Sequence, residues 1–172
     1  ANPSNPTGVT LNSNELNAIA DIAIRNDLWI LVDEVYNDLV FDGVYQSIAG
    51  LPGMLERTVT VSSVSKSYAM TGWRCGWAVG PPALMHHLRR MTLITLYGLP
   101  GFVMEAANVA IREGSEEVAQ ARETYRRRRN LVLEILAEAR NLPTLLPEAG
   151  MFLMADVRAH NDDANVFAWN LY

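Results

Sequence analysis

The stretch Ser62-Ser63-Val64-Ser65-Lys66-Ser67-Tyr68-Ala69-Met70-Thr71-Gly72-Trp73-Arg74-Cys75-Gly76 governs the interpretation of the whole chain. Lys66 is its only lysine, and the other thirteen of the fourteen basic residues are arginines. A lysine amine responds strongly to burial and to neighbouring cations, which makes it usable as a Schiff-base nucleophile. The alternative is that an arginine-rich composition happened to leave one lysine in a polar loop. Lys66 alone does not decide between a functional and an accidental lysine.

Two predicted strands each end just before a residue whose charged side chain could take part in binding or catalysis. Residues 28–32 form a continuous apolar run, typical of a strand buried on both faces of a parallel sheet, and Asp33 follows directly. Residues 58–63 are rich in β-branched side chains and predict the next strand, with Lys66 just beyond it. Apolar residues near a 3.6-residue period predict a helix over 15–26. Polar groups at the carboxyl ends of such strands are how open α/β sheets build ligand sites.

Three motifs together resemble one protein family. S-x-S-K at residues 63–66, followed by M-T-G-W-R-x-G-W at residues 70–77, resembles the cofactor-lysine segment of the class I/II aminotransferases, the fold type I pyridoxal-phosphate enzymes. The turn N-P-S-N-P-T-G at residues 2–8 and D-E-V-Y at residues 33–36 stand in the family's order and at its spacing. Three ordered motifs are a far more specific signal than any one alone.

The resemblance implies roles for four side chains around pyridoxal 5'-phosphate. Lys66 would hold the cofactor as a Schiff base and then move a proton as general base and acid. Asp33 would keep the pyridine nitrogen protonated, and Tyr36 and Asn5 would reach the phenolic oxygen. The residue types alone also allow two simpler interpretations: Asp33 as a solvated acid at a strand end, and residues 2–8 as a plain proline-rich turn. In the family, this turn often contains a cis bond before proline. Glu34 and Asp38 are expected to be surface charges.

The same resemblance also identifies the residues that would bind the phosphate of the cofactor. A serine three residues before the lysine and an arginine eight after it bind phosphate in the family, and these are Ser63 and Arg74 here. Ser65 is a further cofactor-binding candidate, although its position is also used for loop packing. Gly72 and Gly76 would let backbone approach closely, or would serve only as turn residues.

The resemblance also implies the fold and its division. We expect an α/β three-layer sandwich with a mainly parallel sheet, a linking helix and the start of a small α+β domain. Residues 1–112 would be part of the large cofactor-binding domain, 113–142 the interdomain helix and 143–172 the beginning of the small domain. Further elements are predicted as a strand at 77–80, helices at 83–96, 102–113 and 115–139, a linker at 143–147 and a strand within 148–157.

Composition excludes several other classes. The net charge of −5 argues against a nucleic-acid surface, and the arginines 126–129 share their segment with glutamates that predict a solvated helix face. No apolar run reaches the roughly twenty residues of a membrane span. A single cysteine permits no intrachain disulfide, which is consistent with a reducing compartment, and we expect a cytoplasmic protein. His86 and His87 have no acid or cysteine at a ligand spacing, so no metal is expected.

The implied function is transamination between an amino acid and a 2-oxo acid by a homodimer, with the loop around residues 97–101 at the dimer interface. The resemblance further implies that this is an internal fragment of a chain of about four hundred residues. The substrate-carboxylate arginine, an N-terminal phosphate loop and the aromatic residue that stacks on the ring would lie outside it, so the isolated 172 residues are expected to be inactive. Two alternatives stay open: a pyridoxal-phosphate lyase or synthase on the same scaffold, and a non-catalytic interaction module.

Overall fold

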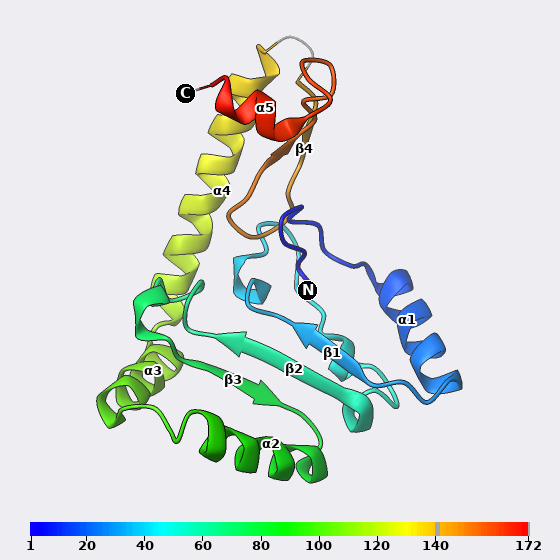
Figure 1. Cartoon of the computed structure of the whole chain (residues 1–172), viewed down its shortest axis with the longest axis vertical. Helices are drawn as coiled ribbons and strands as arrows, with labels where there is room; N and C mark the ends of the chain where they lie inside the picture. The colour runs from blue at the N-terminus through cyan, green and yellow to red at the C-terminus, as the bar shows by residue number, and fades with distance from the viewer. Residues whose placement is uncertain (140–141, 172) are drawn as a thin grey trace.

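The structure, a computed structural model, describes residues 1–139 and 142–171. Its main sheet has three strands in the order β1 (Ile30–Asp33), β2 (Thr58–Ser63) and β3 (Gly76–Val79) (Figure 1). β1 and β2 are parallel and β2 and β3 are antiparallel. Helices and strands therefore form the α/β arrangement that the sequence predicts, with one parallel and one antiparallel pair among the described strands.

Helix α1 (Ser13–Arg25) begins at a complete capping box. The Asn12 side chain accepts hydrogen bonds from the backbone of Asn14 and Glu15, and the Glu15 carboxylate accepts the Asn12 amide at 2.8 Å. These contacts satisfy amide groups that the first helical turn leaves free, so a local sequence pattern fixes where the helix starts.

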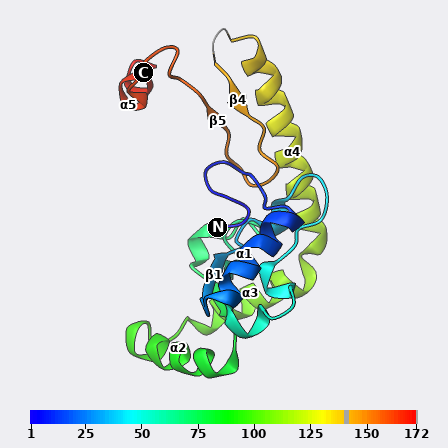
Figure 2. The ribbon, with the colours of Figure 1, turned by 90° about the vertical axis from the view of Figure 1, so that its right-hand side faces the viewer.

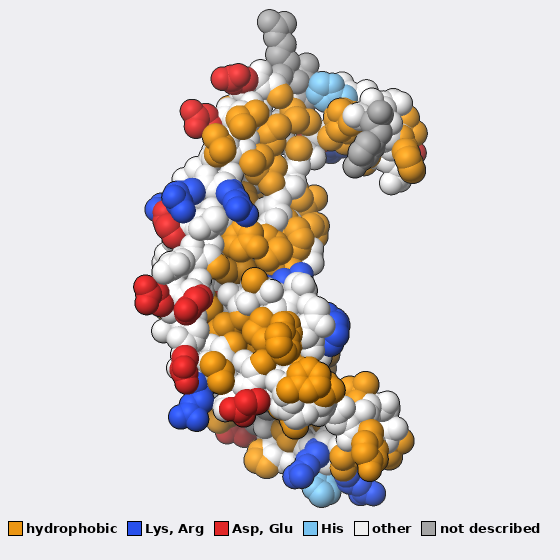
Figure 3. Space-filling model, turned by 90° about the vertical axis from the view of Figure 1, so that its left-hand side faces the viewer, with side chains coloured by type: hydrophobic (Ala, Val, Ile, Leu, Met, Phe, Trp, Pro, Cys, Tyr) orange, Lys and Arg blue, Asp and Glu red, His pale blue; other side chains and the backbone are white. Residues whose placement is uncertain are grey.

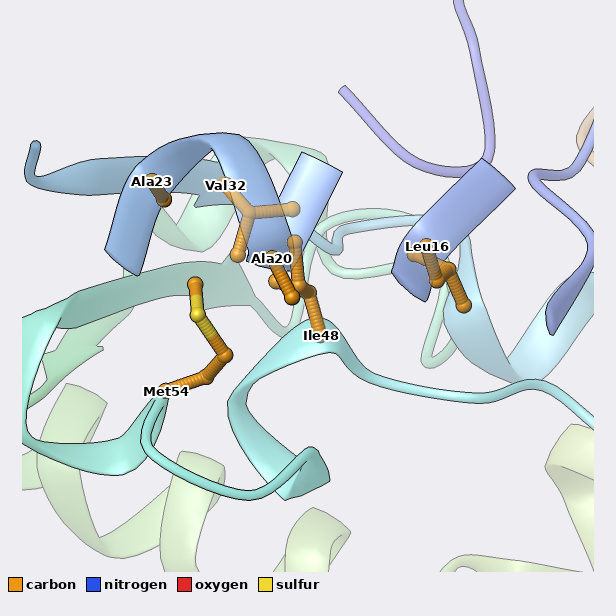
Figure 4. Packing of buried hydrophobic residues seen from close by; sticks show 6 residues of the cluster. All are labelled: Leu16, Ala20, Ala23, Val32, Ile48 and Met54. Atoms are coloured by element: carbon orange, nitrogen blue, oxygen red, sulfur yellow. The ribbon is translucent and has the colours of Figure 1, made fainter. Parts of the chain in front are cut away.

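The main hydrophobic cluster lies between α1, β1 and the segment that contains the 3-10 helix η2 (Ile48–Gly50) (Figure 4). Its side chains are almost completely removed from water, so their burial is the principal driving force for packing α1 against the sheet. The members are Leu16, Ala20, Ala23, Val32, Ile48 and Met54.

The prediction that residues 28–32 are buried on both faces is wrong for the described part of the chain. Val32 is buried, but its neighbour Leu31 is 73% exposed and Trp29 is 58% exposed. Successive side chains of a strand point to opposite faces, and α1 with the η2 segment covers only the face of Val32. No described residue covers the other face of β1.

Three helices follow β3: α2 (Pro82–Thr95) lies below the sheet in Figure 1, α3 (Gly101–Glu113) lies at the lower left, and α4 (Ser115–Ala137) rises from there toward the top. α2 has no buried residue. α3 and α4 meet at Gly114, where a Cβ atom would lie 3.2 Å from the Tyr68 ring and 2.6 Å from the Ala110 oxygen. Figure 3 shows hydrophobic patches among the charged side chains on this side of the molecule.

Helix α4 leads from the sheet to a second, smaller set of elements (Figures 1 and 2). These are the antiparallel strands β4 (Thr144–Leu145) and β5 (Met154–Ala155), and α5 (Ala164–Trp169). The division into domains at 112 and 142 stays a prediction, and residues 140–141 of the expected interdomain helix lie outside the described part. No helix in the described ranges is long and apolar enough to span a bilayer.

The arginine run on α4 is only partly a solvated face. Arg126 pairs with Glu123 at 2.8 Å, as the charge pattern predicts. Arg129 is different, because its side chain is only 10% exposed and lies 4.8 Å from the centre of the Phe41 ring. It also donates a hydrogen bond to the backbone oxygen of Pro147 at 3.1 Å. Arg129 therefore contributes to packing between α4 and two distant segments.

Candidate active site

The predicted lysine and tyrosine meet beyond the carboxyl ends of β1 and β2. Because these strands are parallel, Asp33 at the end of one and Ser63 at the end of the other lie at the same edge of the sheet. The Lys66 amine lies 5.9 Å from the centre of the Tyr36 ring, and Tyr36 is only 3% exposed. The structure thus brings together two residues that are thirty positions apart in sequence.

The N-terminal turn is attached to the same edge. The Asn2 amide donates a hydrogen bond to the Asp33 backbone oxygen at 3.0 Å, and the turn closes on itself through Ser4 and Val9 at 2.9 Å. Both Asn–Pro bonds are cis. Asn5 is exposed within this turn, as is the Asp33 side chain, whose Oδ1 accepts the Val35 amide at 3.0 Å. The polar atoms of both candidates are therefore accessible to a ligand.

The loop that carries Lys66 is closed by the first pair of the β2–β3 ladder. Ser63 pairs with Gly76, and the Val64 amide donates to the Cys75 oxygen at 3.2 Å. A Cβ atom at Gly76 would lie 2.8 Å from the Ser62 oxygen, so the close backbone approach predicted there is confirmed. At Gly72 nothing lies within 4 Å of an added Cβ, which favours the alternative role of a turn residue.

Three polar side chains of this loop are arranged around its closure. The Ser65 amide donates to the Ser63 hydroxyl oxygen at 3.2 Å, which leaves the hydroxyl hydrogen of Ser63 free to donate elsewhere. Arg74 is exposed, has a left-handed backbone with φ 53°, and donates from Nη1 to the Thr71 oxygen at 3.0 Å. The remaining guanidinium donors keep the fork geometry that suits a phosphate.

A segment that the sequence did not assign to the site forms one wall of it. The Phe152 ring packs edge-on against Tyr36 at 5.4 Å between centroids and 77° between planes. Gly150 has φ 84°, and a Cβ atom there would lie 3.7 Å from the Tyr36 ring. The predicted strand within 148–157 is confirmed only at β5, whereas Phe152 lies outside any strand. The motif around Gly150 and Phe152 was the available sequence signal.

We call residues 147–152 the docking segment. The Gly8 oxygen accepts the amides of both Glu148 and Ala149 at 2.9 Å, and Phe41 donates to the Glu148 oxygen at 2.9 Å. A Cβ atom at Gly8 would lie 2.5 Å from Pro147 Cβ and 2.6 Å from the Ala149 oxygen. The docking segment therefore holds the turn that carries Asn5 as well as the wall behind Tyr36.

Burial controls the protonation of Tyr36. Removal from water, and secondarily the charge of Asp33, raise the pKa of the Tyr36 hydroxyl above its ordinary value. The hydroxyl is therefore protonated throughout the neutral range and is available as a hydrogen-bond donor.

Glu34 is not the surface charge that the sequence analysis expects. It is only 6% exposed and its carboxylate accepts a hydrogen bond from the Ser47 hydroxyl at 2.5 Å. The sequence does not indicate which of the two acids after the apolar run is buried. Burial of Glu34 depends on the position of residues 45–48, which are remote from it in sequence.

The polar groups at this edge of the sheet fit pyridoxal 5'-phosphate. One amine, one exposed carboxylate, a protonated phenol and an exposed amide stand on segments that meet at one edge of the sheet. A hydroxyl and a guanidinium flank the loop closure. The four ion pairs among the described residues leave both the amine and the guanidinium unpaired. The groups, in that order, are Lys66, Asp33, Tyr36, Asn5, Ser63 and Arg74.

Comparison with known proteins gives the same class of protein. The sequence profile described as "Aminotransferase class I and II" matches residues 1–169. Arginine–pyruvate transaminase AruH of Pseudomonas aeruginosa is 48% identical over 166 residues, which is 96% of this chain and 42% of that protein. Aromatic-amino-acid aminotransferase 2 of Thermococcus litoralis is 40% identical over 159 residues, 91% of this chain and 41% of that protein. The chain spans less than half the length of these relatives.

Solved structures agree. The aromatic aminotransferase of Pyrococcus horikoshii superposes with a TM-score of 0.92 at 35% identity, covering 98% of this chain and 46% of that one. The Thermus thermophilus aspartate aminotransferase with maleate gives 0.92 at 32% identity, covering 99% and 44%. These matches confirm the predicted aspartate-aminotransferase-like fold. The chain belongs to the class I and II aminotransferases.

Proposed function

We propose that the protein carrying this chain is a pyridoxal-phosphate-dependent aminotransferase that moves an amino group between an amino acid and a 2-oxo acid. The observation that carries the proposal is the position of the Lys66 amine beside the buried Tyr36 ring, at the sheet edge where Asp33 and the turn of Asn5 also lie. Relatives named as transaminases support the reaction class.

Each side chain has a defined task in this reaction. Bound pyridoxal phosphate supplies an electron sink for the bonds at the substrate Cα. Lys66 would hold the cofactor and would act as the general base toward the proton on Cα. Asp33, with its exposed carboxylate, would be the partner of the ring nitrogen and would favour its protonated form. Tyr36 and Asn5 would be the hydrogen-bond donors for the phenolic oxygen.

The phosphate is held by the loop that carries Lys66. Ser63 offers a hydroxyl hydrogen that its contact with Ser65 leaves free, and Arg74 offers guanidinium donors not used by Thr71. We assign Ser65 a lesser part, because its amide already contributes to the loop's own packing. An anchored phosphate keeps the cofactor in place when the covalent bond to Lys66 opens.

We further propose a cytoplasmic homodimer. The resemblance places the loop at residues 97–101 in a subunit interface, and Leu96, Tyr97 and Phe102 around it are 66–89% exposed. Apolar side chains grouped in this way are typical of surfaces that another protein covers. The single Cys75 is consistent with a reducing compartment.

The proposal is tested by reducing the protein with borohydride in the presence of pyridoxal phosphate and mapping the adduct by mass spectrometry. An adduct on Lys66, together with formation of a new amino acid and a 2-oxo acid from a mixed pool of amino acids and pyruvate, is the expected result. Elimination products in place of a new amino acid would indicate a lyase or synthase. Absence of an adduct from the complete protein would indicate a non-catalytic module.

Tyr36→Phe is expected to weaken cofactor binding by about 10- to 100-fold, which corresponds to about 1.5–3 kcal/mol for a hydrogen bond to a charged group. Equilibrium titration of the apoprotein with pyridoxal phosphate measures the loss. Tyr125→Phe on α4 is the matched control: Tyr125 is not one of the proposed cofactor-binding residues, and its ring lines a cavity on the side of Gly150 and Phe152.

The pH dependence of this loss follows from the raised pKa of Tyr36. An ordinary tyrosine loses its proton at about pH 10, so with a raised pKa the advantage over phenylalanine should persist as the pH rises from 7 to about 10.5. An advantage that is lost with a midpoint at about pH 10 would contradict the burial of a neutral phenol at this position.

A further inference from the structure

A buried polar cluster lies next to the candidate site and has no part in the roles above. It consists of Asn2, Glu34, Tyr45 and Ser47. Asn2 is 3% exposed and Glu34 is 6% exposed. Ser47 donates to the Glu34 carboxylate at 2.5 Å. The Tyr45 hydroxyl is buried beside Glu34 and Asn2, without regular hydrogen-bond geometry to a described residue.

The charge in this cluster depends on hydroxyl groups for its stabilisation. No ion pair of the described residues includes Glu34, and a buried carboxylate without a cation is costly unless hydrogen bonds compensate. Burial, and then the neighbouring carboxylate, raise the pKa of Tyr45, so its hydroxyl stays a donor facing an acceptor. Ser47 therefore holds Glu34 by a hydrogen bond, and the buried Tyr45 hydroxyl lies beside the same carboxylate.

Two hydrogen bonds of Asn2 connect this cluster to the cofactor-binding candidates. The Asn2 amide donates to the Asp33 oxygen at 3.0 Å, and the Asn2 side-chain oxygen accepts the Leu11 amide at 3.0 Å. Asn2 thus ties both ends of the turn that carries Asn5, and it ties that turn to Asp33. Glu34 continues the strand pairing through its own amide, which donates to the Val61 oxygen at 2.9 Å.

We propose that Glu34 is a positioning residue: its hydrogen bond to Ser47, with the Tyr45 hydroxyl beside it, fixes the end of β1, and through the hydrogen bond from Asn2 to Asp33 it sets where Asn5 and Asp33 stand relative to the cofactor. The inference rests on the proposed function. Glu34 itself touches neither cofactor nor substrate. Misplacing a binding group by about 1 Å costs up to about 100-fold, so a displaced Asn5 and Asp33 would be measurable.

The test compares Glu34→Gln and Tyr45→Phe with Glu56→Gln in the complete protein that carries this sequence. Glu34→Gln keeps the shape and an acceptor oxygen but removes the charge, and Tyr45→Phe removes one hydroxyl. Glu56→Gln makes the same chemical change at an exposed position in η3 (Leu55–Arg57), outside the buried cluster.

Two measurements are made on each variant. In the apoprotein, hydrogen exchange at the amides of Asn2 and Leu11 is expected to be about tenfold faster in Glu34→Gln and Tyr45→Phe than in the control. In the presence of pyridoxal phosphate, both variants are expected to bind about tenfold more weakly and to show an altered circular dichroism per bound cofactor, because the ring orientation changes.

A purely structural role would lower the melting temperature and leave both the exchange pattern and the dichroism per bound cofactor unchanged, and that result would overturn the inference. So would a Glu34→Gln variant that matches the control throughout. If Glu34→Gln does not fold, Ser47→Ala removes one hydroxyl without changing charge, and the same two measurements decide. If the unaltered protein forms no adduct on Lys66, the proposed function fails, whereas the exchange measurement still supports or overturns the hold of Glu34 on the turn.

Discussion

Lys66→Ala is expected to abolish the borohydride-stable adduct and to reduce transamination by at least about 10²–10⁴-fold, the contribution of one proton-transferring group. Lys66 is the only lysine in the chain, so no neighbouring amine within it can take over. The fold should persist, because among the described residues the amine makes only a weak contact, with the Tyr36 ring at 5.9 Å. Mass spectrometry after reduction and a steady-state assay of keto-acid formation measure the two effects.

Lys66→Arg separates charge from chemistry. An arginine keeps the positive charge near Tyr36, but its guanidinium cannot lose a proton at neutral pH and cannot form the covalent bond. We therefore expect it to be as inactive as Lys66→Ala while unfolding at the same temperature as the unaltered protein. Full function in Lys66→Ala would contradict the enzyme and favour an interaction module that has kept the fold.

Gly8→Ala is expected to destabilise the protein by about 2–5 kcal/mol. Part of the loss is backbone strain, since Gly8 has φ 69° and a residue with a side chain pays about 1–3 kcal/mol there. The rest is overlap, because the new Cβ atom would lie 2.5 Å from Pro147 Cβ. The docking segment must then move away from the Gly8 oxygen, which gives up two hydrogen bonds.

Two glycines in the chain provide controls for Gly8→Ala in denaturant unfolding. Gly43 also has a positive φ of 87° but has nothing within 4 Å of an added Cβ, so Gly43→Ala measures strain alone. Gly50 has an ordinary backbone and open space, so Gly50→Ala should be nearly neutral. If Gly8→Ala loses no more than Gly43→Ala, then the contact with the docking segment contributes little to stability.

Local parts of the fold follow from short stretches of sequence. The apolar period predicts the helix that the structure shows as α1, and its capping box joins Asn12 and Glu15, which lie only three residues apart. The sheet edge could likewise be anticipated, since Asp33 and Lys66 each stand just past a β-rich or apolar run. Arg126 pairs with Glu123 as i,i+3 spacing predicts. In each case the interacting groups are close in sequence, so the pattern contains the geometry.

The errors lie where partners are distant. Leu31 was expected to be buried, but only the face of Val32 is covered by α1 and η2. Arg129 was assigned to a solvated face, but Phe41 and Pro147 enclose it. No local pattern reports such contacts, because they depend on how segments tens of residues apart are packed.

The sequence by itself determined the class of protein and named the candidate lysine and cofactor-binding residues, because these depend on residue types at fixed short spacings. The tertiary structure decided which acid of the Asp33–Glu34 pair is exposed to a ligand and which is buried on Ser47. It also decided that Phe152 forms the wall behind Tyr36. The physical reason is that burial and ring packing depend on contacts between segments that are far apart in sequence, such as the docking segment and the N-terminal turn. The free energy of such contacts depends on both segments, so no single stretch of sequence predicts it.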